Sequence, residues 1–182
     1  MKLLSGDLLF FDADNEILKQ ALIKLITGNP IHVGVILNIE GNLSVVHASK
    51  QKKKIVIEPL KKFFKTQTLH VYRVKKRQLL NIEKLKDELF SFIGKKYGIK
   101  TYLTVALAVF LKLPPEKFKH GDFNKYNPHC AALVSRAFRI AGLDLRPDLP
   151  DVLTLPRDLI KSKELMHLIT FPDGREILGE ES

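Results

Sequence analysis

The amino-acid sequence predicts an α+β fold, because strand patterns gather in the first half of the chain and helical patterns follow them. Apolar runs and alternations typical of strands occupy residues 6–11, 31–39, 43–48, 54–57 and 69–74. Apolar residues at helical spacing follow over residues 79–93 and 130–142. The 182 residues fit one domain with a single sizeable core, and no stretch has the composition of an interdomain linker. We therefore expect a single domain, 1–182.

The first predicted strand begins after Gly6, and Asn15 stands where it caps a predicted helix over residues 16–27. Gly28 and Pro30 end that helix and begin the next strand. The helix is therefore expected between the first two strands of the chain.

The second and third predicted strands flank the segment Glu40-Gly41-Asn42, a connection of the kind expected for a β-hairpin. We predict the register in which His32 lies opposite His47, so that residues 38–41 form the connection. Cross-strand partners lie within side-chain contact range, and this register brings the two histidines together.

The second half of the chain predicts helices joined by loops. A helical turn over residues 58–64 precedes the fifth strand, and the helix over residues 79–93 ends at Gly94. The apolar run 102–111 is shorter than the ~20 residues that cross a bilayer. It predicts a buried core helix or one wall of an apolar cleft. Proline-containing loops are predicted over residues 112–128 and 146–156, and a short strand closes the chain.

Cys130 is the only cysteine, and it opens an apolar helical run. A thiol at a helix N-terminus lies where unpaired backbone N–H groups and the helix dipole favour the thiolate. With histidines elsewhere in the chain, such a cysteine is a candidate nucleophile, although a buried cysteine that only fills the core remains an alternative.

Nucleophilic catalysis by cysteine needs a histidine that moves the proton and a third group that orients the imidazole. Cys130, His32 and His47 supply these types. A zinc site built from the same residues and His129 has permissible ligands, but it lacks the short paired spacing of common zinc motifs. We therefore expect no metal and no organic cofactor.

Five short motifs follow one another along the chain. They are Gly6-Asp7-Leu8-Leu9-Phe10, Pro30-Ile31-His32-Val33-Gly34-Val35, Val46-His47-Ala48, Lys96-Tyr97-Gly98 and His129-Cys130-Ala131-Ala132-Leu133-Val134. In this order they resemble the circularly permuted NlpC-type papain-like cysteine hydrolases, the YiiX/YebB-like family. In unpermuted relatives the cysteine precedes the histidine, whereas here His32 precedes Cys130, which is the hallmark of the permuted branch.

The resemblance implies a papain-like fold in which the cysteine helix packs against a small antiparallel sheet. It implies that Cys130 is the nucleophile, His32 the general base and His47 the orienting residue. The backbone N–H of Cys130, at the helix start, is the natural oxyanion donor. Three further residues are candidates for substrate binding: Tyr97, which is expected to line the cleft, His129 and Asp7.

Two positions depart from the family pattern. Many permuted members carry Glu where this chain has His47, and His is usual in the unpermuted cell-wall peptidases. After the nucleophile the family often reads Cys-Ser-Glu-Leu-Val, whereas this chain has alanine at positions 131 and 132. The second departure removes polar groups from the neighbourhood of the substrate.

The formal net charge is +10, and the lysines fall mostly at turns and at the ends of elements. Few aromatic residues are interleaved with them, so we expect no nucleic-acid partner, and an anionic surface is the partner that the lysine clusters would suit. No transmembrane segment and no signal peptide are apparent. The chain is therefore expected to be cytoplasmic, or exported with its signal removed.

From these observations we expect a thiol hydrolase that cleaves an amide bond in a peptide or amino-acid amide, such as one derived from the cell wall, through a Cys130 thioester. Two alternatives stay open. One is a lipid acyltransferase or thioesterase of the lecithin:retinol acyltransferase-like type, whose acyl chain the apolar run 102–111 would suit. The other is a relative that binds a ligand without chemistry.

Overall fold

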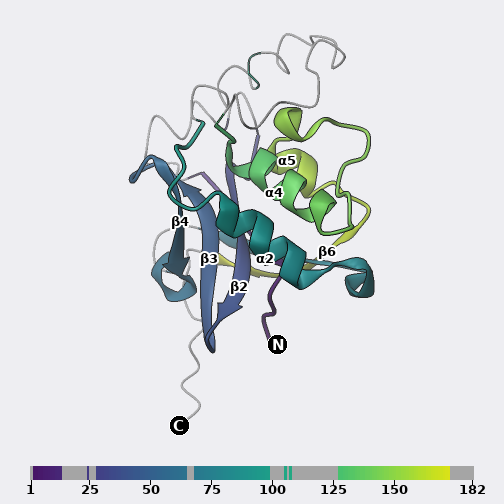
Figure 1. Cartoon of the computed structure of the whole chain (residues 1–182). Helices are drawn as coiled ribbons and strands as arrows, with labels where there is room; N and C mark the ends of the chain where they lie inside the picture. Colours follow the sequence, from purple (N-terminus) through teal and green to yellow (C-terminus); the bar gives the residue numbers. More distant parts are fainter. Residues whose placement is uncertain are drawn as a thin grey trace.

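The computed structural model describes residues 2–13, 24, 28–64, 68–98, 105, 107 and 127–172. In this part of the chain an antiparallel sheet of six strands, in the order β4-β3-β2-β1-β5-β6, is covered on one face by the helices α2 and α4 (Figure 1). The predicted α+β class is confirmed. None of the helices in these residues is long and apolar enough to cross a membrane.

The strands lie where the alternation of the sequence predicts them. Their bounds are β1 Asp7–Phe11, β2 His32–Ile39, β3 Asn42–Ser49, β4 Lys54–Pro59, β5 Leu69–Val74 and β6 Leu165–Phe171. The helices and turns are η1 Leu60–Phe63, η2 Arg77–Leu79, α2 Ile82–Ser91, α4 Cys130–Ile140, η4 Asp151–Leu153 and α5 Pro156–Leu159. Most of the helix predicted over residues 16–27 and most of the segment 102–126 lie outside the described residues. Lys24 is helical in the former; in the latter Val105 and Leu107 are helical, the first buried and the second exposed.

The two main helices begin at side-chain caps. The side chain of Asn81 accepts a hydrogen bond from the backbone N–H of Lys84 and starts α2. His129 does the same for α4, with its Nδ1 3.4 Å from the N–H of Ala132. Cys130 is therefore the first residue of its helix, as the sequence predicts.

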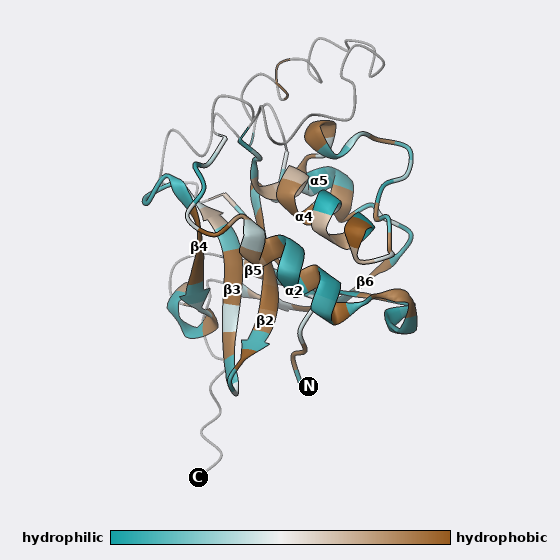
Figure 2. Cartoon of the chain, in the orientation of Figure 1, coloured by the Kyte–Doolittle hydropathy of each residue, from teal (hydrophilic) through white to brown (hydrophobic). Residues whose placement is uncertain are grey.

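The sheet separates two apolar layers. On one face Val33, Val35 and Leu37 of β2 pack with residues of α2 and α4, Cys130 among them. On the other face Leu9, Phe11 and Ile36 pack with η1 and β6. The hydropathy colouring shows the mostly apolar strand β2 passing behind one end of α2 (Figure 2). Because side chains alternate between the faces, His32 shares its face with Ile36, opposite to the face that α4 covers.

The register predicted for the hairpin is wrong by two residues. His47 pairs with Gly34 instead of His32, and the connection is a two-residue turn of Glu40 and Gly41. Both turn residues have positive φ, 51° and 86°, the geometry of the tight turns that suit the twist of a hairpin. A shift of two residues keeps every side chain on its face, so the two histidines remain diagonal neighbours.

Gly34 lies between the two histidines on this face. A Cβ at position 34 would stand 3.0 Å from the Cβ of His47 and 2.6 Å from Cγ1 of Val45. A side chain does not fit at this position without displacing its neighbours. Its absence leaves the space across which the two imidazoles meet.

Candidate active site

Three side chains from adjacent strands form a hydrogen-bonded chain. Nε2 of His32, at the start of β2, is 3.1 Å from Nδ1 of His47 on β3. Nε2 of His47 is 2.9 Å from Oε2 of Glu58 on β4. The chain crosses three strands in two steps, and each step joins diagonal neighbours rather than paired residues. The expected contact of His32 with His47 is thus present despite the corrected register.

Glu58 is buried and carries the negative charge of this chain. Its Oε1 accepts from Nζ of Lys62 at 2.6 Å and lies 3.0 Å from Nζ of Lys52. Burial raises the pKa of Glu58, but the hydrogen bonds from Lys62, His47 and Lys52 outweigh it and hold the pKa at about 2. Glu58 is therefore ionised at neutral pH.

The ionised carboxylate sets the position of each proton in the chain. A carboxylate only accepts hydrogen bonds, so Nε2 of His47 is the donor to Glu58. In the neutral ring Nδ1 of His47 is then an acceptor, and Nε2 of His32 donates to it. The proton of neutral His32 consequently resides on Nε2, and its Nδ1 holds a free lone pair.

Both imidazoles are neutral at pH 7. Burial lowers the pKa of His32 well below its usual value, and it is lowered further by the charge that His47 carries when protonated and by the charge of Lys50. Burial also lowers the pKa of His47, although Glu58 opposes the shift. The rings of Phe11 and Phe63 make the surroundings apolar, with centroids 5.1 Å from His32 and 5.2 Å from His47 respectively.

Nδ1 of His32 is buried and has no hydrogen-bond partner among the described residues. Burying a polar nitrogen without a partner costs free energy. A buried imidazole whose other nitrogen is fixed by a carboxylate-anchored chain is the arrangement expected of a general base. The unused lone pair on Nδ1 of His32 is therefore the feature of this cluster that could accept a proton.

The Cys130 thiol lies against the backbone of Val33, the residue that follows His32, and not beside the His32 ring. Burial raises the pKa of the Cys130 thiol. Hydrogen bonds from the backbone N–H groups of Val33, Ala131 and Cys130 itself, and the charge of Lys50, oppose that rise. Val33 directly follows His32, so the thiol reaches the start of β2 from the helix side of the sheet. The expectation of a thiolate favoured by the helix start is not met, because burial outweighs these groups.

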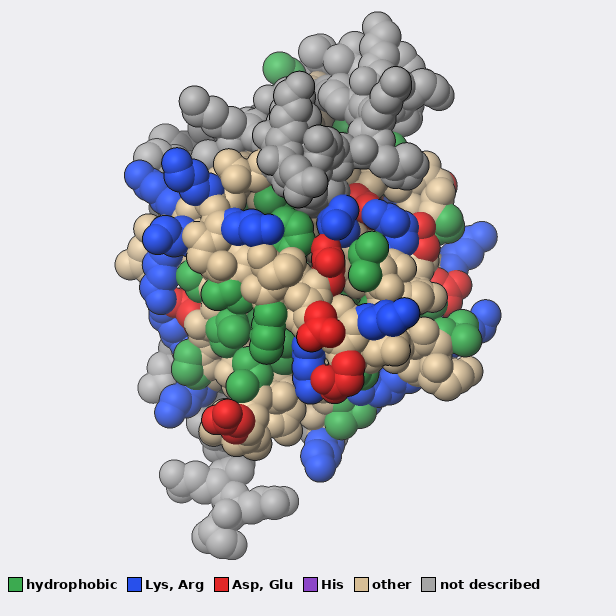
Figure 3. Space-filling view, in the orientation of Figure 1, with side chains coloured by type: hydrophobic (Ala, Val, Ile, Leu, Met, Phe, Trp, Pro, Cys, Tyr) green, Lys and Arg blue, Asp and Glu red, His purple; other side chains and the backbone are tan. Residues whose placement is uncertain are grey.

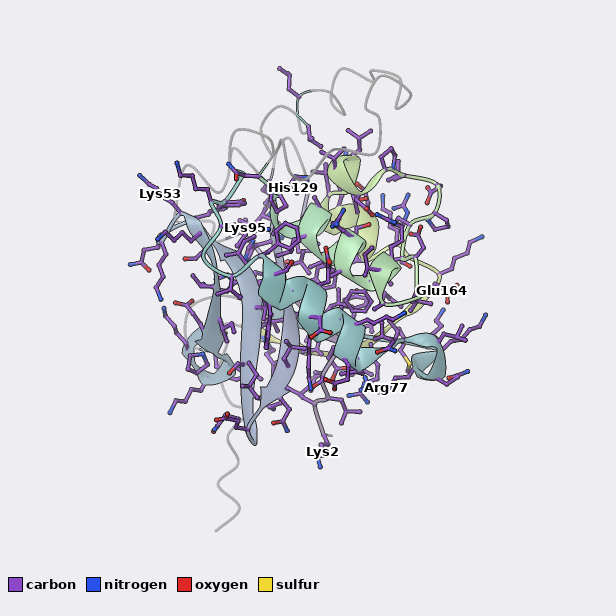
Figure 4. All side chains as sticks on the ribbon, viewed as in Figure 1. Lys2, Lys53, Arg77, Lys95, His129 and Glu164 are labelled. Atoms are coloured by element: carbon purple, nitrogen blue, oxygen red, sulfur yellow. The ribbon has the colours of Figure 1, made fainter. Side chains whose placement is uncertain are left out.

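His129 occupies a structural position. It is fully buried at the start of α4 (Figure 4), and its Nε2 donates to the carbonyl oxygen of Val152 at 2.9 Å while Nδ1 caps the helix. Burial lowers its pKa to about 4. Its two ring nitrogens hold α4 and η4 together, and through them His129 places Cys130.

Of the other two predicted binding residues, Tyr97 is buried in the same core layer as Cys130. Its N–H donates to Lys53 at the β3–β4 turn, and the next residue, Gly98, donates to Pro128 just before α4. Asp7 lies at the other end of β1 from Phe11. It forms a two-point ion pair with Arg73 and accepts the N–H of Leu4. The structure does not bring Asp7 to the histidines.

A cavity of about 360 Å³ opens beside the histidine chain. Its lining comprises Phe11, Ile31, His32, His47, Ala48, Ser49, Lys50, Gln51, Glu58, Lys62 and Phe63. Cys130 is not part of this lining. The cavity therefore borders the two imidazoles, and the thiol lies on the other face of β2, an inner strand of the sheet.

Two residues of the site, Glu58 and Lys50, were not predicted from the sequence. Glu58 is the second-to-last residue of β4 and has Lys62 four residues later, a spacing that indicates an ion pair once a helical turn is expected there. Lys50 belongs to the lysines at turns and element ends, which the sequence assigns to the surface, whereas in the structure it is partly buried beside the cavity. No sequence signal separated it from its neighbours.

The donor set does not converge on a metal. Within the described residues no group of three or more His, Cys, Asp or Glu side chains is placed to hold an ion. Both ring nitrogens of His47 and of His129 already make hydrogen bonds within the protein.

Comparison with protein-family models and with curated proteins finds no match to this sequence. Among solved structures, the chain is similar to the crystal structure of YiiX from Escherichia coli O157:H7, which is described as a metalloprotein. The TM-score is 0.64, the sequence identity is 15%, and the match covers 93% of this chain and 98% of that one. The protein therefore has a YiiX-like fold.

Proposed function

We propose that the protein is a cysteine-dependent hydrolase that cleaves an amide bond through a thioester on Cys130. The observation that carries this proposal is the unpartnered Nδ1 of His32, whose lone pair is fixed by His47 and Glu58. Its neighbour Val33 contacts the thiol through the backbone. The base and its carboxylate-anchored orienting chain lie on one face of β2, and the thiol reaches the first residues of the same strand from the opposite face. The resemblance of the ordered motifs to permuted NlpC-type proteins, and the YiiX-like fold, agree with it.

The reaction begins with a neutral thiol and a neutral imidazole, because burial disfavours both charged forms. Nδ1 of His32 takes the thiol proton as the sulfur attacks the carbonyl carbon. The imidazolium that forms is stabilised through His47 by the carboxylate of Glu58. The oxyanion accepts from the N–H of Cys130, and His32 gives its proton to the leaving nitrogen.

Hydrolysis of the thioester repeats these steps with water. Nδ1 of His32 takes a proton from the water as its oxygen attacks the thioester carbonyl. The carbon–sulfur bond breaks, the carboxylic acid leaves, and the thiolate recovers its proton from His32. The proposal requires Sγ and Nδ1 to approach to hydrogen-bond distance, which catalytic groups without ligand commonly reach only when substrate binds.

The test is the pH dependence of Cys130 alkylation by iodoacetamide, read by intact mass in wild type and His32→Ala. At pH 7 the wild type is expected to react about 100-fold faster, the scale of general-base assistance. The two rates should converge above the raised thiol pKa, where the sulfur ionises without help. The advantage should also vanish below the depressed pKa of His32, where Nδ1 is protonated. Equal rates across the whole range would refute the pair.

Cys130→Ser separates catalysis from binding. If the protein only binds a ligand, the variant should bind that ligand with unchanged affinity. If the protein is a hydrolase, the variant should no longer turn over the substrate. The description of YiiX as a metalloprotein suggests a further control. Protein purified without chelator should contain no stoichiometric zinc, because in this chain the ring nitrogens of His47 and His129 are engaged.

A further inference from the structure

Lys50 stands apart from the other lysines of this basic chain. Figure 3 shows lysine and arginine side chains gathered along the sheet edge near β4, where they face solvent. Lys50 follows directly after β3, is partly buried, and lines the cavity with His32 and His47. A charge partly removed from water without a partner is costly, so the position of this ammonium group calls for an explanation.

The carboxylate of the cavity is already occupied. Glu58 is bound by Lys62 at 2.6 Å and by Lys52 at 3.0 Å, so two lysines share one negative charge. None of the carboxylates in the described residues forms an ion pair with Lys50. Because the imidazoles are neutral, the cavity wall carries more positive than negative charge. Lys50 is the lysine of this wall that has no carboxylate partner among the described residues.

Lys50 also acts electrostatically on the groups of the proposed chemistry. Its charge acts on both the thiol of Cys130 and the imidazole of His32, which lie on different sides of β2. Burial lowers the pKa of Lys50, and the negative charge of an ionised Cys130 would raise it. The ammonium group is thus within electrostatic range of the reacting atoms while it faces a cavity large enough for a small molecule.

We propose that Lys50 binds a negatively charged oxygen group of the substrate, a carboxylate or a phosphate, close to the bond that is cleaved. A lysine ammonium is a compact point charge that suits either group. Inside a cavity with low-dielectric walls one unpaired cation attracts an anion more strongly than the same cation on the surface. This inference rests on the proposed function and narrows its substrates to small anionic acyl compounds.

The first experiment uses two alkylating reagents that differ in charge. Iodoacetate carries a carboxylate, whereas iodoacetamide is neutral, and the ratio of their rates with Cys130 cancels the thiolate fraction at a given pH. Lys50→Met is expected to lower the iodoacetate-to-iodoacetamide ratio about tenfold, the order of one partly buried charge pair. Lys50→Arg should keep the ratio. Lys54→Met, on the exposed residue that pairs with Ser49 across the strands, is the matched control and should also keep it.

An unchanged ratio in Lys50→Met would overturn the inference, even if His32→Ala shows that the Cys130–His32 pair is reactive. If both rates fall equally, Lys50 only tunes the thiol, and anion recognition is excluded.

A second experiment does not depend on reactivity. The ring protons of His32 and His47 are followed by NMR in Cys130→Ser during titration with N-acetylglycine, N-acetylglycinamide and inorganic phosphate. Saturable shifts with an anion but not with the amide, weakened about tenfold by Lys50→Met, support the inference even where Cys130 is unreactive. The anion that saturates at the lower concentration identifies carboxylate or phosphate. Shifts that are absent, or equal in Lys50→Met, overturn it.

Discussion

Two histidines with lowered pKa values, His32 and His129, stand at the starts of β2 and α4, and they differ in how many of their ring nitrogens make hydrogen bonds. Burial lowers the pKa of both rings, although His32 borders the cavity and is partly exposed whereas His129 is fully buried. His129 uses Nδ1 to cap α4 and Nε2 to bind Val152. His32 uses only Nε2, and its Nδ1 has no partner among the described residues.

The difference shows why burial and a shifted pKa do not by themselves mark a functional residue. Both histidines satisfy those criteria, as structural networks often do. The two residues differ in the number of ring nitrogens that make hydrogen bonds. A general base needs a nitrogen with an unused lone pair, whereas a capping residue uses its lone pair to accept a backbone N–H. By this criterion His129 holds the scaffold and His32 is available for chemistry.

The largest expected effect is on stability, and it differs between His129→Ala and His32→Ala. His129→Ala should lower the free energy of unfolding by about 3 kcal/mol, because it removes a helix cap and leaves the Val152 carbonyl unpaired in the core. His32→Ala should cost less than about 1 kcal/mol, since it also removes an unsatisfied nitrogen. Urea unfolding at pH 7 measures both. A loss in His32→Ala as large as that in His129→Ala would mean that His32 is a scaffold residue as well.

The next effect concerns Glu58, the carboxylate that fixes the protons of His47 and His32. Glu58→Gln removes the charge that fixes the protons of His47 and His32, and Cys130 alkylation at pH 7 should slow about tenfold. The ¹⁵N shifts of His32 should change from a fixed Nε2–H form to a mixture of tautomers. Lys54→Met, which leaves the hydrogen-bonded chain intact, is the control. An unchanged tautomer in Glu58→Gln would show that the carboxylate does not orient the base.

The smallest expected effect is a change in how steeply the free energy of unfolding depends on pH. Unfolded histidine binds a proton below about pH 6.5, whereas folded His129 resists protonation until about pH 4. Stability from this residue is therefore fully present above pH 6.5 and is lost as pH falls toward 4. His129→Asn keeps a capping acceptor without titrating, and its unfolding free energy should fall less steeply, by up to about 1.4 kcal/mol per pH unit. Parallel curves for wild type and His129→Asn would assign the acid sensitivity to other groups.

The local pattern of the sequence was sufficient for the elements. Alternating apolar residues predicted all the strands in the described residues of the first half of the chain, and Cys130 was correctly placed at a helix start. These features depend on neighbours two to four positions away, and their periodicity is visible in the sequence. The contact between His32 and His47 followed from the hairpin, although its register was wrong by two residues.

Only the tertiary structure decided the rest. Whether the turn held two or four residues depended on the positive φ angles at Glu40 and Gly41, which the residue types permit but do not require. The partner of His47 is Glu58, eleven residues away, and the cap role of His129 required Val152 to pack against it. Lys50 looked like any other lysine until the fold buried it beside the cavity. Sequence periodicity determines which face a side chain occupies, but the distant segments that pack against that face determine which polar groups are paired and which remain free.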